Sequence, residues 1–216
     1  MRKKIYIAIL NQGSVRTEMA QLILDLAKQD KYETLVSYPA DKPITQNRNK
    51  IVKKFLETDY DFLLMLDGDC IPPQNILELA DYNKDIAGGL CFGFLKKMII
   101  PFCMKDRGDG KYDMADVYED GGMVECDAIG TGCIMIARKV LEDMPFPFRN
   151  EYDPEGIKIQ GLDFNFCRRA KKKGHNVFCN TSMPVSHWTI IDLKTMWANF
   201  NQLKQVATNT LNKENK

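Results

Sequence analysis

Apolar runs and segments with helical spacing alternate along the first part of the chain. Ile5 to Leu10 and Phe62 to Leu66 are continuous apolar runs, which are typical of strands buried on both faces of a sheet. Between them, apolar residues recur at helical spacing from Val15 to Leu26 and again from Ile51 to Leu56. Strands that alternate with helices predict an α/β protein with a mainly parallel central sheet.

The most informative stretch is the end of the Phe62 to Leu66 run. Two carboxylates, Asp67 and Asp69, follow it and bracket Gly68. Residues two apart in an extended chain point to the same side, so both carboxylates can converge on one hard cation, and Gly68 lets a ligand approach the backbone closely. An ordinary polar turn after a core strand would show the same three residues. The rest of the chain has to decide between the two interpretations.

Three other segments place candidate binding groups near strand or helix ends. Asn11 and Gln12 follow the first strand, where open α/β sheets bind ligands. Arg48 stands at the predicted start of a helix, where a guanidinium and the helix amides could both face phosphate, although a lone arginine is more often solvated. Gly132 and Cys133 belong to a Gly-Thr-Gly loop before a predicted strand, which we interpret as a loop that places backbone near a substrate.

The second half of the chain supplies the remaining polar candidates. Asp163 opens a predicted helix that ends at Gly174, and its alternative role is to complement the helix dipole. His187 follows a predicted edge strand and is either a satisfied core histidine or a third metal ligand beside the two carboxylates. Trp188 comes directly after it and is counted among the candidate substrate-binding residues.

Two segments depart from the alternating pattern. Residues 92–126 are rich in charge and glycine, which predicts hairpins or a mobile flap, either on the acceptor side of a site or as surface decoration. Residues 191–216 predict a C-terminal helix and a tail. The apolar stripe of that helix consists of Leu193, Met196, Trp197, Phe200, Leu203 and Val206. We expect residues 1–190 to form one domain, and the helix to pack on it or on a second copy of the chain in a homodimer.

Composition narrows the classes of function. The chain has 216 residues, of which 44% are hydrophobic, and this is enough for one full core. A formal net charge of +1 gives no general attraction to nucleic acid or anionic lipid. Seven cysteines without a Cys-x-x-Cys pair disfavour a disulfide framework and a structural zinc site, and favour a reducing, cytoplasmic environment. The N-terminal apolar run is too short for a membrane span, so we expect no transmembrane segment.

Taken in order, these marks resemble the GT-A glycosyltransferases, nucleotide-sugar-dependent enzymes with a diaspartate (DxD) motif, and within them the family 2-like, small stand-alone type. The resemblance covers most of the chain, roughly Ile5 to Trp188. It rests on Gln46-Asn47-Arg48-Asn49, Asp67-Gly68-Asp69, Gly130-Thr131-Gly132-Cys133, Gly161-Leu162-Asp163 and His187. It implies a single Rossmann-like GT-A domain that transfers a hexose from a nucleoside-diphosphate sugar, with a UDP-sugar favoured, to a hydroxyl acceptor.

The resemblance also implies roles for individual residues. It implies a Mn²⁺ or Mg²⁺ ion on the donor diphosphate, held by Asp67, Asp69 and His187. Against the nucleoside and phosphates it places Asn11, Gln12, Arg48 and Asp67. Asp163 then faces the acceptor as a catalytic base. The family often has Gly-Glu-Asp where this chain has Gly161-Leu162-Asp163, so Asp163 is left as the one local candidate for the base.

Several alternatives stay open. A nucleotidyltransferase would use similar carboxylates, but the loop after the first strand lacks the Gly-rich, basic sequence that cradles a triphosphate. A non-catalytic nucleotide-sugar or glycan-binding module is disfavoured by the complete set of metal and base positions. The acceptor is a glycan, a protein, a small molecule or a hydroxylated base in DNA, whose backbone the basic run from Arg168 to Lys173 could contact. Inversion or retention at the sugar also stays open.

Overall fold

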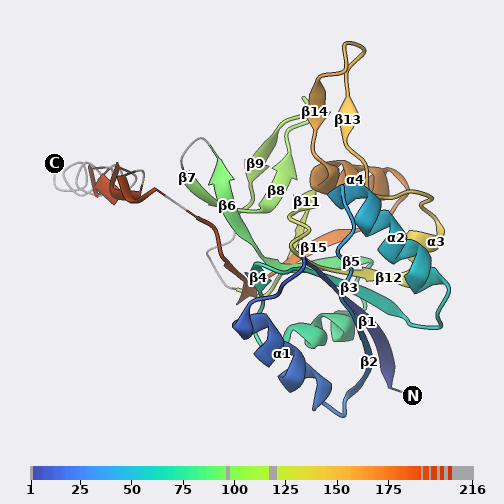
Figure 1. The fold of residues 1–216 in the computed structure, drawn as a ribbon. Coiled ribbons are helices and arrows are strands. Elements are labelled where there is room, and N and C mark those ends of the chain that lie inside the picture. Colours follow the sequence, from blue (N-terminus) through green and yellow to red (C-terminus); the bar gives the residue numbers. More distant parts are fainter. Residues whose placement is uncertain are drawn as a thin grey trace.

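A seven-stranded sheet forms the centre of the computed structural model, which describes residues 2–95, 98–116, 121–190, 192–194, 196–198, 200–201 and 204–205 (Figure 1). The strand order is β10-β15-β5-β12-β3-β1-β2. The strands are β1 (Lys3–Leu10), β2 (Tyr32–Ser37), β3 (Phe62–Asp67), β5 (Ile86–Leu90), β10 (Met123–Cys126), β12 (Cys133–Ala137) and β15 (Val177–Pro184). All run in one direction except β12 and β10, which are antiparallel to their neighbours. The predicted α/β class with a mainly parallel sheet is confirmed.

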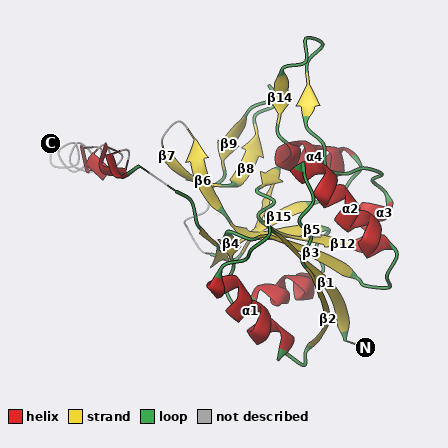
Figure 2. Cartoon of the chain, viewed as in Figure 1, coloured by secondary structure: helices red, strands yellow, loops and turns green. Residues whose placement is uncertain are grey.

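Helices cover both faces of this sheet (Figure 2). One face carries α1 (Thr17–Ala27) and the 3-10 helix η1 (Ile76–Tyr82), and the other carries α2 (Ile44–Leu56), α3 (Arg138–Glu142) and α4 (Leu162–Lys172). Strand β1, which lies between β3 and β2, shows why its apolar run is continuous. Ile7 belongs to the core under α1 with Met19, whereas its neighbour Ala8 belongs to the core under α2 with Phe55. Successive side chains point to opposite faces, so both faces need apolar residues.

The predicted hairpin insertion in residues 92–126 is confirmed. Its strands are β6 (Phe92–Leu95), β7 (Met98–Pro101), β8 (Cys103–Asp106) and β9 (Tyr112–Met114), before β10 joins the main sheet. β6 pairs with β7, and β8 pairs with β9 and with β11 (Ala128–Ile129). A second hairpin, β13 (Glu151–Tyr152) with β14 (Lys158–Gln160), leads into α4 and projects from the body (Figure 1). Residues 96–97 and 117–120 lie outside the described residues, and the role of the insertion as a flap stays a prediction.

The C-terminal helix is present, but its expected packing on the domain is wrong. After β16 (Ser186–His187), which pairs with β4 (Cys70–Ile71), the chain leaves the body and becomes helical from residue 193 (Figure 1). The apolar stripe stays exposed, with Leu193 at 80% and Trp197 at 66%, because the segment after β16 turns away from the sheet. Leu203 and Val206 of the predicted stripe lie outside the described residues. Among the described helices, none is long and apolar enough to cross a bilayer.

Candidate functional site

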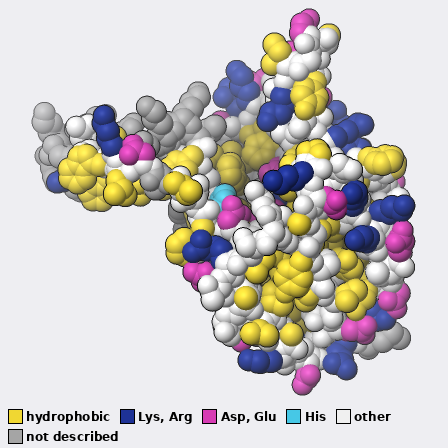
Figure 3. All heavy atoms as spheres, in the orientation of Figure 1, with side chains coloured by type: hydrophobic (Ala, Val, Ile, Leu, Met, Phe, Trp, Pro, Cys, Tyr) yellow, Lys and Arg dark blue, Asp and Glu magenta, His cyan; other side chains and the backbone are white. Residues whose placement is uncertain are grey.

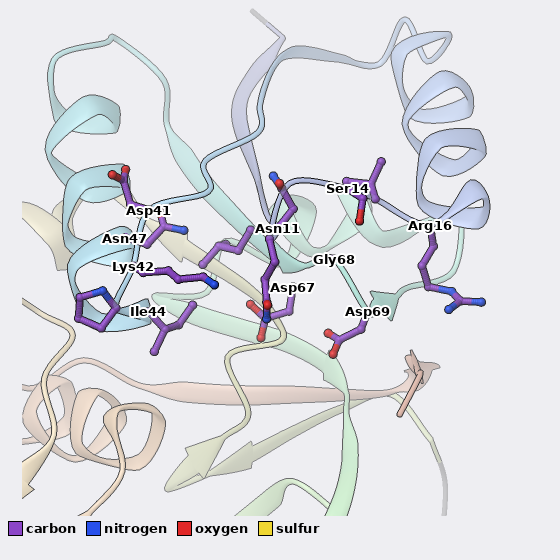
Figure 4. Close-up of a pocket in the computed structure, with 14 residues that line it drawn as sticks. Asn11, Ser14, Arg16, Asp41, Lys42, Ile44, Asn47, Asp67, Gly68 and Asp69 are labelled. Carbon is purple, nitrogen blue, oxygen red and sulfur yellow. The ribbon is translucent and has the colours of Figure 1, made fainter. Parts of the chain in front are cut away.

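A cavity of about 780 Å³ opens where the parallel strands β1 and β3 end (Figure 4). Its walls come from the loop after β1, the start of α1, the segment before α2 and the turn after β3. Of the candidates from the sequence, it contains Asn11, Gln12, Asp67, Gly68 and Asp69. Its position beyond the carboxyl ends of the strands is that of ligand sites in open α/β sheets, and its volume suits a small molecule or cofactor.

The side chain of Asn11 is engaged in holding the loop. Its Nδ2 donates to the carbonyl oxygens of Ile9 and Pro39 at 3.2 and 3.4 Å, and its Oδ1 accepts from the backbone N–H of Gly13 at 2.9 Å. These bonds use both ends of the amide, so Asn11 shapes the cavity wall. Gln12 is exposed beside it.

Three charged residues that the sequence analysis missed also line the cavity: Arg16, Asp41 and Lys42. Arg16 is the N-cap residue of α1, and the other two lie in the loop between β2 and α2. Each follows the carboxyl end of a parallel strand by a few residues. That shared position is the signal that could have identified them.

Arg48 lies beneath the turn that follows β3, and the expectation of an arginine at a helix start, solvated or facing phosphate, is corrected. The helix begins at Ile44, which puts Arg48 in its second turn with a side chain only 2% exposed. Its Nη2 donates to both carboxylate oxygens of Asp67 at 2.8 and 3.0 Å, and its Nη1 donates to the carbonyl of Thr131 at 3.2 Å. The guanidinium therefore fixes Asp67 and the loop before β12 from below.

Asp67 is held in place by that guanidinium. Partial burial raises the pKa of Asp67, the Arg48 charge opposes the rise, and the nearby carboxylates of Asp163 and Asp69 add to it. The predicted convergence of Asp67 and Asp69 assumed an extended chain through both residues. β3 ends at Asp67 and a turn begins at Gly68, so the alternation stops between them. A metal-ligand role for Asp67 stays a prediction.

Gly68 is needed for close packing of two strand ends. Its N–H donates to the carbonyl of Leu10 at 2.7 Å, and a Cβ atom at this position would lie 2.9 Å from the same oxygen. Any larger residue would therefore separate the ends of β1 and β3. This explains the glycine without a ligand.

Asp69 and His187 form the candidate metal centre. The Nε2 atom of His187 lies 3.7 Å from Oδ2 of Asp69, and its Nδ1 lies 2.6 Å from the carbonyl oxygen of Phe92. Because a carbonyl only accepts hydrogen bonds, this contact selects the tautomer of the neutral imidazole that has its proton on Nδ1 and a lone pair on Nε2, the form that binds a metal. A carboxylate oxygen and an imidazole nitrogen suit Mn²⁺, and the carboxylate also suits Mg²⁺. These two residues fit the implied ion.

The third group within reach is the thiol of Cys70. In the part of the chain that the structure describes, its sulfur lies with the Asp69 and His187 ligand atoms inside 4.8 Å. Hydrogen bonding with Cys91 and burial raise the pKa of Cys70, so the thiol keeps its proton. Since the thiolate is the ligating form and is soft, Cys70 does not belong to the set that fits a hard cation.

Asp163 is connected through Thr131 to the hydrogen bonds that Arg48 makes with Asp67. Its Oδ1 accepts a hydrogen bond from the Thr131 hydroxyl at 2.6 Å, and Thr131 is 1% exposed. The carbonyl of Thr131 is the acceptor for Arg48, so one buried residue links the start of α4 to the base of the turn after β3. Thr131 was not among the candidates from the sequence, because a threonine between two glycines gives no signal of a buried partner.

Gly132 and Cys133 lie behind the turn: Cys133 is buried and does not face a substrate, and a substrate-binding role for the partly exposed Gly132 stays a prediction. The carbonyl of Gly132 accepts from the N–H of Asp67 at 2.9 Å, and a Cβ atom at Gly132 would lie 2.7 Å from the sulfur of Cys70. Cys133 is fully buried, and burial raises its pKa to about 12. Both residues support the turn.

Trp188 contacts two residues of the site, Asp69 and Arg16. Its backbone N–H donates to the carbonyl of Asp69 at 2.9 Å, and its ring lies 4.1 Å from the guanidinium carbon of Arg16. This cation–π contact holds Arg16 beside the metal centre. The predicted role of Trp188 in substrate binding is not tested by this contact.

Replacing Arg48 tests its support of the turn. Arg48→Met keeps an apolar stem but leaves the Asp67 carboxylate without its bidentate partner, so we expect a loss of about 1.5–3 kcal/mol in the free energy of unfolding, measured with urea. Adding Asp67→Asn should restore part of this loss, because a neutral amide needs no cation. Arg107→Met, at an exposed turn, is the control and should change stability by less than about 0.5 kcal/mol. Equal stability of Arg48→Met and the wild type would contradict the assignment.

Comparisons with known proteins show the fold. No protein-family model matches the chain, and no curated protein matches it either. Among solved structures, A197 from STIV is similar, with a TM-score of 0.57, 22% identity and coverage of 88% of this chain and 87% of that one. The inositol-1-phosphate CTP transferase from T. maritima matches with a TM-score of 0.49, 10% identity and coverage of 87% and 89%. A glycosyltransferase involved in glycosylation of the major capsid of PBCV-1 has a TM-score of 0.36, 15% identity and coverage of 64% and 62%. The likeness to A197 places this chain on a known mixed α/β fold.

Proposed function

We propose that the protein is a metal-dependent glycosyltransferase of the GT-A type, which moves a sugar from a nucleoside-diphosphate sugar, with a UDP-sugar favoured, to a hydroxyl acceptor. The observation that carries the proposal is the Asp69 and His187 pair at the edge of a cavity of about 780 Å³. A bound Mn²⁺ or Mg²⁺ would supply positive charge to the departing diphosphate. The cavity has room for a nucleoside and a sugar.

Different residues would bind the metal ion, the phosphates and the nucleoside of the donor. Asp69 and His187 would hold the ion, and Arg16 adds a guanidinium beside them that suits the same phosphates. Asn11 and Gln12 shape the wall against which the nucleoside would lie. Arg48 acts through Asp67, because its charge is already engaged below the turn.

Asp163 is the proposed acceptor-side base. One carboxylate oxygen accepts a hydrogen bond from the Thr131 hydroxyl, which orients the group. The other oxygen is then the one that would take the proton of the incoming hydroxyl. Attack from this side gives inversion at the sugar, whereas entry from the leaving-group side gives retention and leaves Asp163 with a positioning role.

The basic residues at the end of α4 bear on whether the acceptor could be a base in DNA. Arg168 pairs with Glu151, Lys171 pairs with Asp127, and Lys173 lies 3.1 Å from Asp143. Because these cations are matched by carboxylates, they give little support to contact with a DNA backbone. A glycan, a protein or a small molecule is therefore favoured over a modified DNA base. All seven cysteines are free and buried, which supports the proposed reducing, cytoplasmic location.

A nucleotidyltransferase is the second candidate, and Arg16 is the observation that favours it. The loop after β1 was expected to bring no basic group to the site, yet Arg16 follows it closely and lines the cavity. Arg16, which stacks on Trp188, and Lys42 both line the cavity, but Asp41, Asp67 and Asp69 line it as well, so the wall offers less positive charge than a triphosphate requires. The glycosyltransferase therefore remains the stronger proposal.

Product analysis tests the proposed function directly. We expect nucleoside diphosphate release from a panel of nucleotide sugars with Mn²⁺, and loss of this release in EDTA. Asp69→Ala should abolish turnover and weaken metal-dependent donor binding, because the diphosphate charge is then unbalanced. Asp143→Ala, far along the surface, is the control. Full activity in EDTA would contradict the metal role, and pyrophosphate release from a nucleoside triphosphate with a sugar phosphate would favour the second candidate.

Two conservative changes separate catalysis by Asp163 from a helix-capping role. Asp163→Asn keeps the shape and removes the basicity, so kcat should fall by roughly 10²–10⁴-fold while calorimetric donor binding stays close to wild type. Thr131→Val should also lower kcat, by a smaller factor, because the carboxylate loses the bond that orients it. A residue that only complements the helix would instead cost about 0.5–2 kcal/mol of stability with turnover little changed.

A further inference from the structure

The cavity has two ends with different chemistry (Figure 4). One end carries Arg16 and Asp69, and Asp69 forms the candidate metal centre there with His187. Figure 3 shows a histidine beside an acidic side chain on this open face of the molecule. The other end is formed by the segment from Asp41 to Asn47, which spans the loop before α2 and the first turn of that helix. A nucleotide with its phosphates at the first end would place its base at the second.

Asn47, at this second end, has a buried oxygen that lacks a hydrogen bond. The residue lines the cavity although it is only 1% exposed. Its Nδ2 atom donates to the carbonyl oxygen of Pro39 at 3.3 Å, and this fixes the orientation of the amide, because the reverse orientation would bring two oxygens together. Its Oδ1 atom has no hydrogen-bond partner within the described residues. Buried acceptors of this kind are uncommon and costly, so a ligand that brought a donor to this oxygen would gain affinity.

Lys42 supplies a donor at the same end of the cavity. It is exposed, and in the part of the chain that the structure describes its side chain forms no hydrogen bond or ion pair. The carboxylate of the adjacent Asp41 is engaged by Lys50 at 2.7 Å instead. Ile44, which is 42% exposed, adds apolar surface between Lys42 and Asn47. Exposed side chains change rotamer readily, so a flat ring can lie against this surface and bring its edge to the donor and the buried acceptor.

We propose that Asn47 and Lys42 recognise the base of the donor nucleotide, and that they select a keto base, uracil or guanine, over cytosine or adenine. Uracil has an N3–H donor beside the O4 acceptor, and guanine has N1–H beside O6, so either edge matches the Asn47 oxygen and the Lys42 ammonium. Cytosine and adenine have a lone pair and an amino group at these positions, which reverses both contacts and leaves the groups of the protein unpaired. The proposal rests on the proposed function, which makes the ligand a nucleoside diphosphate.

Calorimetric titration of the full chain with UDP, CDP, GDP and ADP in the presence of Mn²⁺ tests this selection without any use of catalysis. We expect the wild type to bind UDP at least about tenfold more tightly than CDP, or GDP more tightly than ADP by the same factor, and the better pair identifies the base. Lys42→Met removes the donor at similar length, and the preference should fall by about threefold or more. Asn47→Ala should reduce it further, with thermal melting to check the fold. Lys53→Met is the matched control: Lys53 is exposed on α2 outside the cavity lining, and its replacement should leave all four affinities unchanged.

Two outcomes would overturn the base assignment and leave the proposed function standing. These are equal affinities within both pairs of nucleotides in the wild type, or an unchanged preference in Lys42→Met. Because Lys42 is exposed, its variant decides the matter even where Asn47→Ala does not fold. Absence of binding by all four nucleotides would overturn the assignment together with the proposed function. Keto-selective binding without nucleoside diphosphate release from any nucleotide sugar would support the assignment and count against the proposed function alone.

Discussion

The buried ion pair between Arg48 and Asp67 is the constraint on which the site depends. A guanidinium that is 2% exposed needs an anion and further acceptors, and it finds them at the end of β3 and in the carbonyl of Thr131. Three parts of the chain are thereby joined at one point: α2, the turn after β3 and the loop before β12. Removal of one partner from such a pair leaves an uncompensated charge, which is why the arrangement holds its geometry.

Two carboxylates separated by a single glycine have different environments as a consequence. Asp67 is turned toward the buried cation, whereas Asp69 lies in the turn itself and is exposed beside His187. One carboxylate supports the turn and the other is available to a cation. The hydroxyl of Thr131 carries the same network to Asp163, so the proposed base and the proposed metal centre rest on a common support although their residues are far apart in the sequence.

A short pairing between two strands brings the metal-binding candidates together. In the ladder of β16 with β4, His187 lies opposite Cys70, the residue next to Asp69. The Phe92 carbonyl at the start of the hairpin insertion then orients the imidazole. The same pairing determines where the chain leaves the body after Trp188, and it therefore links the candidate site to the exposed C-terminal helix.

The sequence by itself determined the alternating elements, the α/β class and the position of Asp67-Gly68-Asp69 at a strand end, because these follow from local hydrophobic period and turn chemistry. It placed Asp163 in a first helical turn for the same reason. Only the tertiary structure decided that Arg48 is buried: the helix starts at Ile44, four residues before Arg48, and packing on the sheet selects the face. The contacts of His187 with Asp69, Arg16 with Trp188 and Thr131 with Asp163 join residues distant along the chain. Such contacts depend on strand order and register, which no local period encodes.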